Sequence, residues 1–287
     1  MTLYHQNRLL SRKNKDRRRL TVFKLTKKTN YDNIALNEKS WHKGEIMQLL
    51  IRLKNDLIKL PIATGETVQG LIYKALREDS RYSDLVHNNG KLSDGRKFKL
   101  FTFGELKGRY TVEGRYISYF SSVELEVRSA DDYIIQLLFS HFTNNKQLRL
   151  GNNDVEVEKL RLLNDSVFSN ELHIKTLSPI TVYLTEPDGH TKYFSPHDDE
   201  FYDMICTNAR RKWISCYGTD EGFSFSVSPA EENQRYVKRA TKFKDTFISA
   251  WHGEFIIKGA PKVLDFLYNV GLGSKNSQGF GMFNILK

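Results

Sequence analysis

Apolar and polar residues alternate over the stretch that begins at Met47, and this pattern predicts a strand over about 47–53. After a short connection through Pro61 and Gly65, apolar residues recur at i, i+3, i+4, i+7 and i+8 from Val68, which predicts a helix over about 66–77. Tyr73 lies on this helix but away from the apolar stripe. Its hydroxyl is therefore expected to face solvent or a ligand.

The rest of the first half alternates between strand-like and helix-like patterns. A short helical turn at 83–86 leads to His87, and a polar, turn-forming run follows at 88–97. The elements predicted after it are strands at 98–103, 110–118 and 123–127, a helix at 131–142, and a strand or hairpin at 147–162. This order is βαββαβ with extra strands, which is the ferredoxin-like plan.

The second half repeats the plan without a visible sequence repeat. The predicted elements are a strand at 172–184 broken near Pro179, a helix from Ser195 through Lys212, strands at 223–227, 235–241 and 246–257, a helix at 261–270 and a strand at 280–286. We interpret the acidic residues Asp198, Asp199 and Glu200 as a helix start rather than a metal or acid–base cluster. The predicted fold class is α+β, with two tandem ferredoxin-like (RRM-like, βαββαβ) domains at 47–168 and 169–287.

Charge and composition change the picture mainly at the N-terminus. Residues 1–46 hold 12 Lys and Arg against 4 Asp and Glu, so this basic leader carries most of the formal net charge of +10. The alternatives for it are an arm that binds RNA and, preferred here, a disordered or non-native leader with translation starting at Met47. No apolar run is long enough for a transmembrane helix, and Cys206 and Cys216 do not make a disulfide framework. A cytoplasmic protein without membrane contact is expected.

Residues 271–281, GLGSKNSQGFG, hold four glycines around a polar centre. Pro261 suits the first position of the preceding helix, and Gly271 suits its C-terminal end. The order is therefore helix, glycine loop, strand. Nucleotide-binding loops run in the order strand, loop, helix, so a mononucleotide site is not expected here.

The run GLGSKNSQGFGMFNIL resembles the C-terminal glycine-rich signature of the CRISPR-associated repeat endoribonucleases, the Cas-six family of the RAMP superfamily. MQLLIRLKND…LPIATGETVQGLIYKAL, from Met47, resembles the opening strand and helix of that family. TLSPITVYL, from Thr176, resembles the strand that opens its second half. The resemblance spans about 47–287 and leaves the leader uncovered.

The resemblance implies a metal-independent endoribonuclease that cleaves CRISPR precursor RNA within the repeat. The ribose 2′-hydroxyl attacks the adjacent phosphorus, which leaves 2′,3′-cyclic phosphate and 5′-hydroxyl ends. The family's residues map onto Tyr73 as positioning group or base, His87 as acid–base and Lys99 as charge stabiliser. The interval from histidine to lysine is longer than usual, so Lys91 and Lys97 stay open for the last role. No cofactor or metal is expected, and no HExxH or CxxC spacing occurs.

Two stretches are candidates for contact with RNA. On the strand predicted at 236–244, Tyr236 would share a face with several basic residues, which suits phosphates and a stacked base. The predicted RNA-binding residues are Lys238, Arg239, Lys242 and Lys244 on this strand, and Gly271, Gly273, Lys275, Asn276, Gly279 and Gly281 in the glycine loop. Loop amides would donate to phosphate, although the glycines could instead serve only tight packing on the Tyr73 helix.

The expected partner is CRISPR repeat RNA, as precursor and as mature guide. A CRISPR effector complex is a second expected partner, and a homodimer is left open. Two other functions stay as alternatives: a RAMP subunit that holds RNA in an effector complex without cutting, and an unrelated RRM-like RNA-binding protein.

Overall fold

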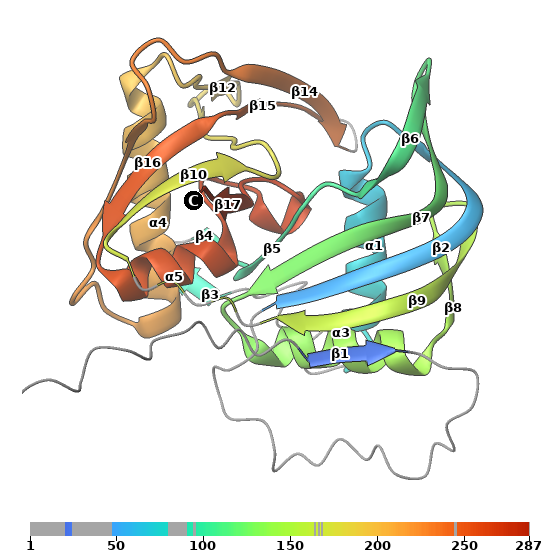
Figure 1. The fold of residues 1–287 in the computed structure, drawn as a ribbon. Coiled ribbons are helices and arrows are strands. Elements are labelled where there is room, and N and C mark those ends of the chain that lie inside the picture. The colour runs from blue at the N-terminus through green and yellow to red at the C-terminus, as the bar shows by residue number, and fades with distance from the viewer. Residues whose placement is uncertain are drawn as a thin grey trace, which may run out of the picture.

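The computed structural model describes residues 21–24, 48–79, 91–93, 96–163, 165, 167, 169–243 and 246–286. Two antiparallel sheets form two lobes that lie side by side, each with two helices (Figure 1). The first lobe ends with a strand at Leu163, and the second begins with a strand at Glu171. None of the helices in the described residues is long and apolar enough to cross a lipid bilayer.

The first lobe is built from β2 (Gln48–Pro61), α1 (Gly65–Leu76), β5 (Phe101–Phe103), β7 (Tyr116–Ser129), α3 (Asp132–Asn144) and β9 (Asn153–Leu163). Its central strand order is β9-β2-β7-β5. Strands β1 (Thr21–Lys24), β6 (Lys107–Glu113) and β8 (Gln147–Leu150) extend this sheet, and β3 (Lys91–Ser93) pairs with β4 (Arg96–Phe98) in a separate hairpin. The leader thus contributes an edge strand, β1, which pairs with β9.

The second lobe is built from β10 (Glu171–Thr176), α4 (Asp199–Tyr217), β13 (Phe225–Pro229), β16 (Glu254–Gly259), α5 (Pro261–Val270) and β17 (Phe283–Ile285). Its strand order is β13-β16-β10-β17. Added to it are the hairpins β11 (Tyr183–Thr185) with β12 (Thr191–Tyr193) and β14 (Val237–Phe243) with β15 (Thr246–His252), and the short helix η3 (Asn276–Gln278).

Both lobes place their four central strands in the same order, with the first strand between the third and the fourth and the second strand at the edge. With one helix after the first strand and one after the third, this is the ferredoxin-like arrangement. The prediction of an α+β chain with two tandem ferredoxin-like folds is therefore confirmed.

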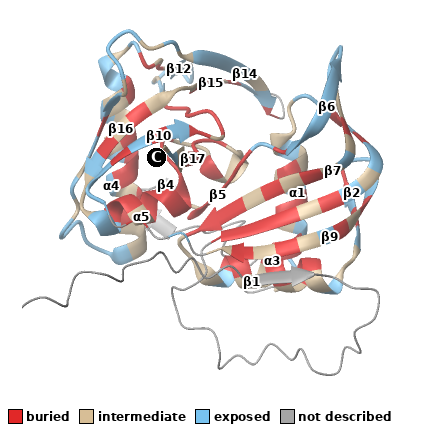
Figure 2. Cartoon of the chain, in the orientation of Figure 1, coloured by how far each residue is buried: buried red, intermediate tan, exposed pale blue. Residues whose placement is uncertain are grey.

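Alternation along the strands and the apolar stripe of α1 account for the first core. The five stripe residues predicted from the sequence, Val68, Leu71, Ile72, Ala75 and Leu76, are all buried in it. A second core fills the other lobe between its sheet, α4 and α5. Figure 2 shows buried residues along the central strands, whereas β6 and the outer part of β14 are exposed. Each lobe thus has a core of its own.

Several element bounds differ from the predictions, and two differences have a clear physical cause. The strand predicted at 246–257 is two strands, because Gly253 breaks it between β15 and β16. The second predicted helix begins at Asp199 with Asp198 as its N-cap, and Asp198 accepts hydrogen bonds from the Ser195 backbone N–H and hydroxyl. The helix was predicted to begin four residues earlier, at Ser195. The acidic residues belong to the helix start, as predicted.

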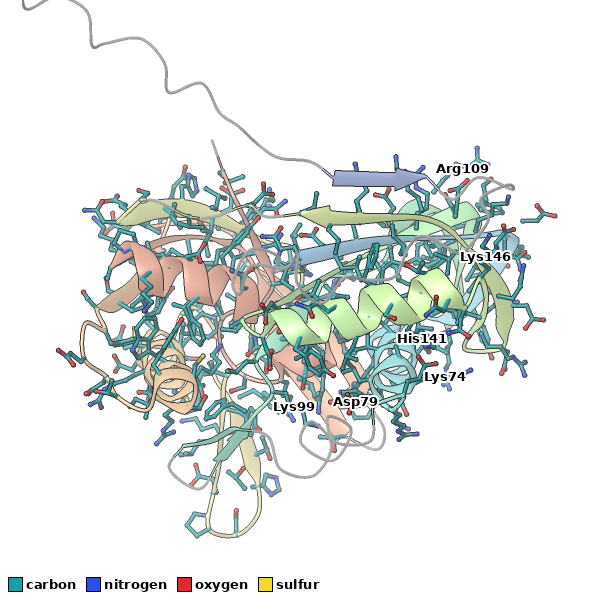
Figure 3. All side chains as sticks on the ribbon, turned by 90° about the horizontal axis from the view of Figure 1, so that it is seen from below. Lys74, Asp79, Lys99, Arg109, His141 and Lys146 are labelled. Atoms are coloured by element: carbon teal, nitrogen blue, oxygen red, sulfur yellow. The ribbon has the colours of Figure 1, made fainter. Side chains whose placement is uncertain are left out.

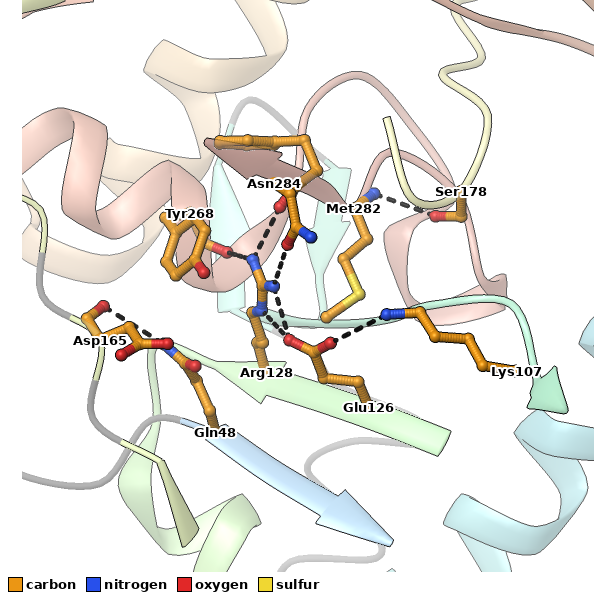
Figure 4. Close-up of polar contacts among 10 residues, drawn as sticks. Gln48, Lys107, Glu126, Arg128, Asp165, Ser178, Tyr268, Met282 and Asn284 are labelled. Atoms are coloured by element: carbon orange, nitrogen blue, oxygen red, sulfur yellow. Dashed lines mark hydrogen bonds and ion pairs between the residues drawn. The ribbon is translucent and has the colours of Figure 1, made fainter. Parts of the chain in front are cut away.

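Arg128 on β7 joins the two lobes (Figure 4). It is 1% exposed, and its guanidinium donates to the Phe283 carbonyl at 2.8 Å in the second lobe. It also lies 3.9 Å above the centre of the Tyr268 ring and pairs with Glu126 of its own strand. Burial opposes ionisation of Glu126, but Arg128 and Lys107 outweigh it and hold the pKa of that carboxyl below its usual value. The lobes are thus held in a fixed arrangement by a buried, charged contact.

Candidate active site between the lobes

Tyr73 and Lys99 form a contact pair where the two lobes meet. The Lys99 ammonium donates to the Tyr73 hydroxyl at 2.9 Å and lies 4.9 Å from the centre of its ring. Tyr73 is half-buried on α1, and its ring meets the Phe101 ring edge-on. Lys99 precedes β5 and lies near the middle of the molecule when it is viewed from below (Figure 3). The phenol and ammonium that the sequence singled out are therefore brought together.

Both lobes line a pocket of about 320 Å³ around this pair. The first lobe contributes Gln69, Tyr73 and Lys99. The second lobe contributes Phe243, Thr246 and Ile248 from the β14–β15 hairpin and Lys275, Ser277 and Gln278 from the glycine loop. Two lysines, one tyrosine and two glutamines thus line one cavity. A cationic pocket of this kind suits a phosphate group.

The glycine loop packs directly on α1 and β5. Gln69 of α1 donates through Nε2 to the Ser277 carbonyl at 2.7 Å. Gly279 has a φ of +90°, and a Cβ at this position would lie 2.6 Å from the Phe103 ring. Only glycine allows both the left-handed backbone and this close approach. The contact expected between the terminal glycine loop and the opening helix of the first lobe is present.

Backbone groups on the inner side of the glycine loop make hydrogen bonds within the protein. The amides of Gly271, Gly279 and Gly281 donate to the carbonyls of Leu267, Asn276 and Pro179, so these amides are not offered to a ligand. Gly271, Gly273, Asn276 and Gly281 are buried, whereas Lys275 and Gly279 are partly exposed. Of the six loop residues predicted to contact RNA, four therefore face the interior, and tight packing accounts for their presence.

The β14–β15 hairpin carries the predicted basic residues. Lys238, Arg239 and Lys242 are all exposed. Lys242 pairs across the hairpin with Phe247, which is 68% exposed, so a cation and an aromatic ring share one face. Phe247 was not among the residues predicted to contact RNA. The only signal for it in the sequence is an aromatic residue at a solvent-facing strand position.

Three other residues do not extend this basic surface of the hairpin. The Tyr236 ring precedes the hairpin and stacks on Phe255 at 5.7 Å, inside the second lobe. Arg210 pairs with Asp220, and Lys212 is 2% exposed beneath the glycine loop. The basic surface is therefore confined, among these candidates, to the hairpin itself.

Some predicted residues lie outside the described part of the chain. These are His87 and Lys244; the side chains of Lys91 and Lys97, the alternatives to Lys99, are also not described. Among the other histidines, His141 is only 3% exposed, and its Nδ1 lies 2.8 Å from Glu78. Lys99 is the candidate whose contact with Tyr73 the structure describes.

Comparisons with known proteins find chains that are similar to this one over both lobes. Residues 163–285 match the family model described as CRISPR associated protein Cas6, C-terminal. The chain is 25% identical over 250 residues to the CRISPR-associated endoribonuclease Cas6 of Pyrococcus furiosus, which covers 83% of this chain and 90% of the relative. It is 27% identical over 254 residues to the CRISPR-associated endoribonuclease Cas6 1 of Methanocaldococcus jannaschii, which covers 83% of this chain and 92% of that protein.

A solved structure described as CRISPR associated protein Cas6 has the same fold. It superposes with a TM-score of 0.70 at 23% sequence identity, over 85% of this chain and 100% of the other. The family model covers the second lobe, and the relatives extend the similarity across both lobes. Residues 163–285 match the model of the Cas6 C-terminal domain, and the resemblance of the whole two-lobed chain to that family is confirmed.

Proposed function

We propose that this protein is a metal-independent endoribonuclease that cuts CRISPR precursor RNA once within each repeat. The observation that carries the proposal is the Tyr73–Lys99 pair in a cationic pocket formed by both lobes. The similarity to proteins named CRISPR-associated endoribonucleases supports the choice of reaction and substrate. The relevant unit is the two-lobed body that follows the leader, divided near residue 168.

The chemistry uses groups that this chain supplies. The ribose 2′-hydroxyl loses its proton to a base and forms a bond to the adjacent phosphorus. The bond from phosphorus to the 5′-oxygen breaks, and that oxygen takes a proton from an acid. A 2′,3′-cyclic phosphate and a 5′-hydroxyl result. We assign acid–base transfer to His87, because an imidazole titrates near neutral pH.

Tyr73 and Lys99 have complementary roles in this scheme. The Lys99 ammonium stabilises the negative charge that grows on the phosphorane oxygens, which is most effective in a pocket shielded from water. The Tyr73 hydroxyl accepts one of its three protons and so fixes the direction of the ammonium. The phenol also lies within the cavity, where it can position the 2′-hydroxyl or act as its base.

RNA binding is assigned to the surfaces that leave this pocket. Lys238, Lys242 and Phe247 on the hairpin suit phosphates and one stacked base. Lys275 suits a phosphate inside the pocket, where its ammonium lies 4.8 Å from the centre of the Tyr183 ring. We also assign an RNA contact to Lys244, because it directly follows the strand that carries Lys238 and Lys242.

The test is cleavage of end-labelled RNA that carries the repeat of the array in the protein's own genome, with EDTA present. One cut per repeat, a cyclic phosphate on the upstream product and loss of cutting in His87→Ala are expected. Cutting that requires an added metal, or an unchanged rate in His87→Ala, would contradict the mechanism. RNA with deoxyribose at the scissile position must bind without being cut. If the normal RNA also binds without being cut, the alternative of an RNA-holding RAMP subunit is favoured.

A further inference from the structure

Lys212 on α4 has a buried ammonium that is directed at the glycine loop. Its side chain is 2% exposed, and no carboxylate within the described residues pairs with it. The ammonium donates to the Gly271 carbonyl, to Asn276 Oδ1 at 3.1 Å and to the Gly273 carbonyl at 3.4 Å. Burying an ammonium costs several kcal/mol unless its protons are satisfied. Here three protons meet three loop oxygens, so the loop is the partner that keeps Lys212 inside.

Asn276 continues this network across the loop. Its Nδ2 donates to the Leu272 carbonyl at 2.8 Å and to the Phe280 carbonyl at 3.0 Å, so one amide ties the two arms together. Gly281 makes room for it, because a Cβ there would lie 2.7 Å from Asn276 Nδ2. The loop is thus folded around a Lys212–Asn276 pair that lies beneath it.

The two sequence neighbours of Asn276 face the pocket. Lys275, in the left-handed conformation with φ of 58°, lines the cavity that holds Tyr73 and Lys99. The carbonyl of Ser277 accepts the hydrogen bond from Gln69 on the Tyr73 helix. A shift of Asn276 therefore moves both the ammonium of Lys275 and the contact that docks the loop on α1.

We propose that Lys212 is a positioning residue for RNA cleavage, which holds the glycine loop in the shape that presents Lys275 and Ser277 to the Tyr73–Lys99 pocket. This inference rests on the proposed nuclease function. Lys212 itself does not touch the RNA, because the loop lies between it and the pocket. Its effect is on the rate of the chemical step, since misplacing groups in an active site by about 1 Å can cost about a hundredfold in rate.

The variant Lys212→Met separates positioning from simple stabilisation. Methionine keeps the length and loses the donors and the charge. Burial lowers the pKa of Lys212 to about 7, which shows how strongly this site disfavours the charged form. The replacement removes the cost of burying a charge, which offsets the loss of its hydrogen bonds to the loop. If Lys212 only stabilises the fold, its replacement lowers the unfolding midpoint and the cleavage rate together. If Lys212 positions the loop, its replacement lowers the cleavage rate without lowering the midpoint.

The measurements are the single-turnover rate constant at saturating protein, the Kd for repeat RNA with deoxyribose at the scissile position, and the unfolding midpoint. For Lys212→Met we expect the rate constant to fall by at least about tenfold while Kd stays within about threefold. Lys262→Met is the matched control, because Lys262 is exposed on α5 and its ammonium contacts the Tyr217 ring at 4.6 Å, not the loop. It is expected to cut at the wild-type rate.

A wild-type rate in Lys212→Met, or a rate loss matched by a lower midpoint, overturns the inference. Should that variant fail to fold, Asn276→Asp carries the test alone. It keeps an acceptor for Lys212 but loses both donors to Leu272 and Phe280, so its rate must also fall at unchanged Kd, and a wild-type rate would refute the inference. Failure of the proposed function looks different, because the wild-type protein would then not cut the repeat RNA at all.

Discussion

The Lys99 ammonium donates a 2.9 Å hydrogen bond to the Tyr73 hydroxyl and at the same time lies 4.9 Å from the centre of the tyrosine ring. The two residues are 26 positions apart and come from different elements, one from α1 and one from the segment before β5. Hydrogen bond and cation–π contact together fix the position of the ammonium without removing its charge. A charged donor held in place is what stabilisation of a phosphorane needs.

Replacing Lys99 by methionine is expected to lower the single-turnover cleavage rate by about a hundredfold or more, because the fixed positive charge is lost. Binding of deoxyribose-substituted repeat RNA should weaken much less. Lys74→Met serves as control, since Lys74 is the exposed neighbour of Tyr73 on the same helix. If Lys99→Met cuts as fast as Lys74→Met, the charge-stabilising role belongs to another lysine.

Tyr73→Phe removes the hydroxyl and keeps the ring under Lys99. We expect the cleavage rate to fall by about tenfold to a hundredfold at unchanged RNA affinity, since loss of a group that positions or accepts a proton affects the transition state. Tyr116→Phe is a matched control, because Tyr116 also lies beneath a lysine, with Lys59 at 5.0 Å from its ring, but far along β7. Equal rates in the two variants would leave Tyr73 with a packing role only.

The hairpin residues are predicted to govern affinity rather than rate. Lys238→Gln and Lys242→Gln should each weaken binding of repeat RNA and reduce the slope of log K against log salt by about one unit, because each lysine that contacts a phosphate releases about one counterion. The rate at saturating protein should not change. Filter binding over a range of salt concentrations measures both quantities. Lys192→Gln on β12 provides a comparison, and an equal slope in all three variants would argue against RNA contact by the hairpin.

The sequence predicted much of this fold because local rules agreed with one another. Helix α5 was predicted with the bounds it has, since Pro261 suits its first turn and Gly271 its end. The buried stripe of α1 followed from helical periodicity and left Tyr73 outside it, where the ring packs against the edge of the first core and the side chain lines the pocket. Such features depend only on residues within one element.

Features that depend on the contact between lobes were not predicted. Arg128 points away from the core of its own lobe and is buried only because the second lobe covers it. The burial of Lys212 was also missed, although Ile205, Asn208, Ala209, Lys212 and Trp213 of α4 follow the spacing of a buried stripe. The sequence gives no sign that this lysine is buried, because its acceptors are loop carbonyls about 60 positions away in the chain.

Arg128→Met is expected to destabilise the protein by about 3–5 kcal/mol, because it leaves the Glu126 carboxylate buried without its main partner. The double variant Glu126→Gln, Arg128→Met should recover part of this loss, since the remaining charge is also removed. Denaturant unfolding of the three proteins measures both effects. Additive losses would show that Arg128 and Glu126 act independently.

The same pair predicts a dependence on pH. Because the pKa of Glu126 is lowered in the folded protein, its contribution to stability is present above the ordinary glutamate pKa and is lost as pH falls toward the lowered value. The stability difference between the wild type and Glu126→Gln should therefore shrink on acidification below about pH 4.5. A difference that stays constant over this range would contradict the role of the ion pair.

Lys212 predicts a second rise of stability with pH, in the alkaline range. Burial lowers its pKa from 10.5 in the unfolded chain to about 7 in the folded protein, so between these values the unfolded state binds the additional proton. The free energy of unfolding must then rise with pH, by up to about 1.4 kcal/mol per pH unit for one proton. Lys212→Met removes this term, so the stability of the wild type relative to the variant should increase from pH 7 to pH 9. Lys262→Met serves as the control, because it shows how much the loss of an exposed lysine changes the pH dependence of stability. A difference that does not change with pH would mean that the three loop oxygens keep the Lys212 ammonium charged throughout.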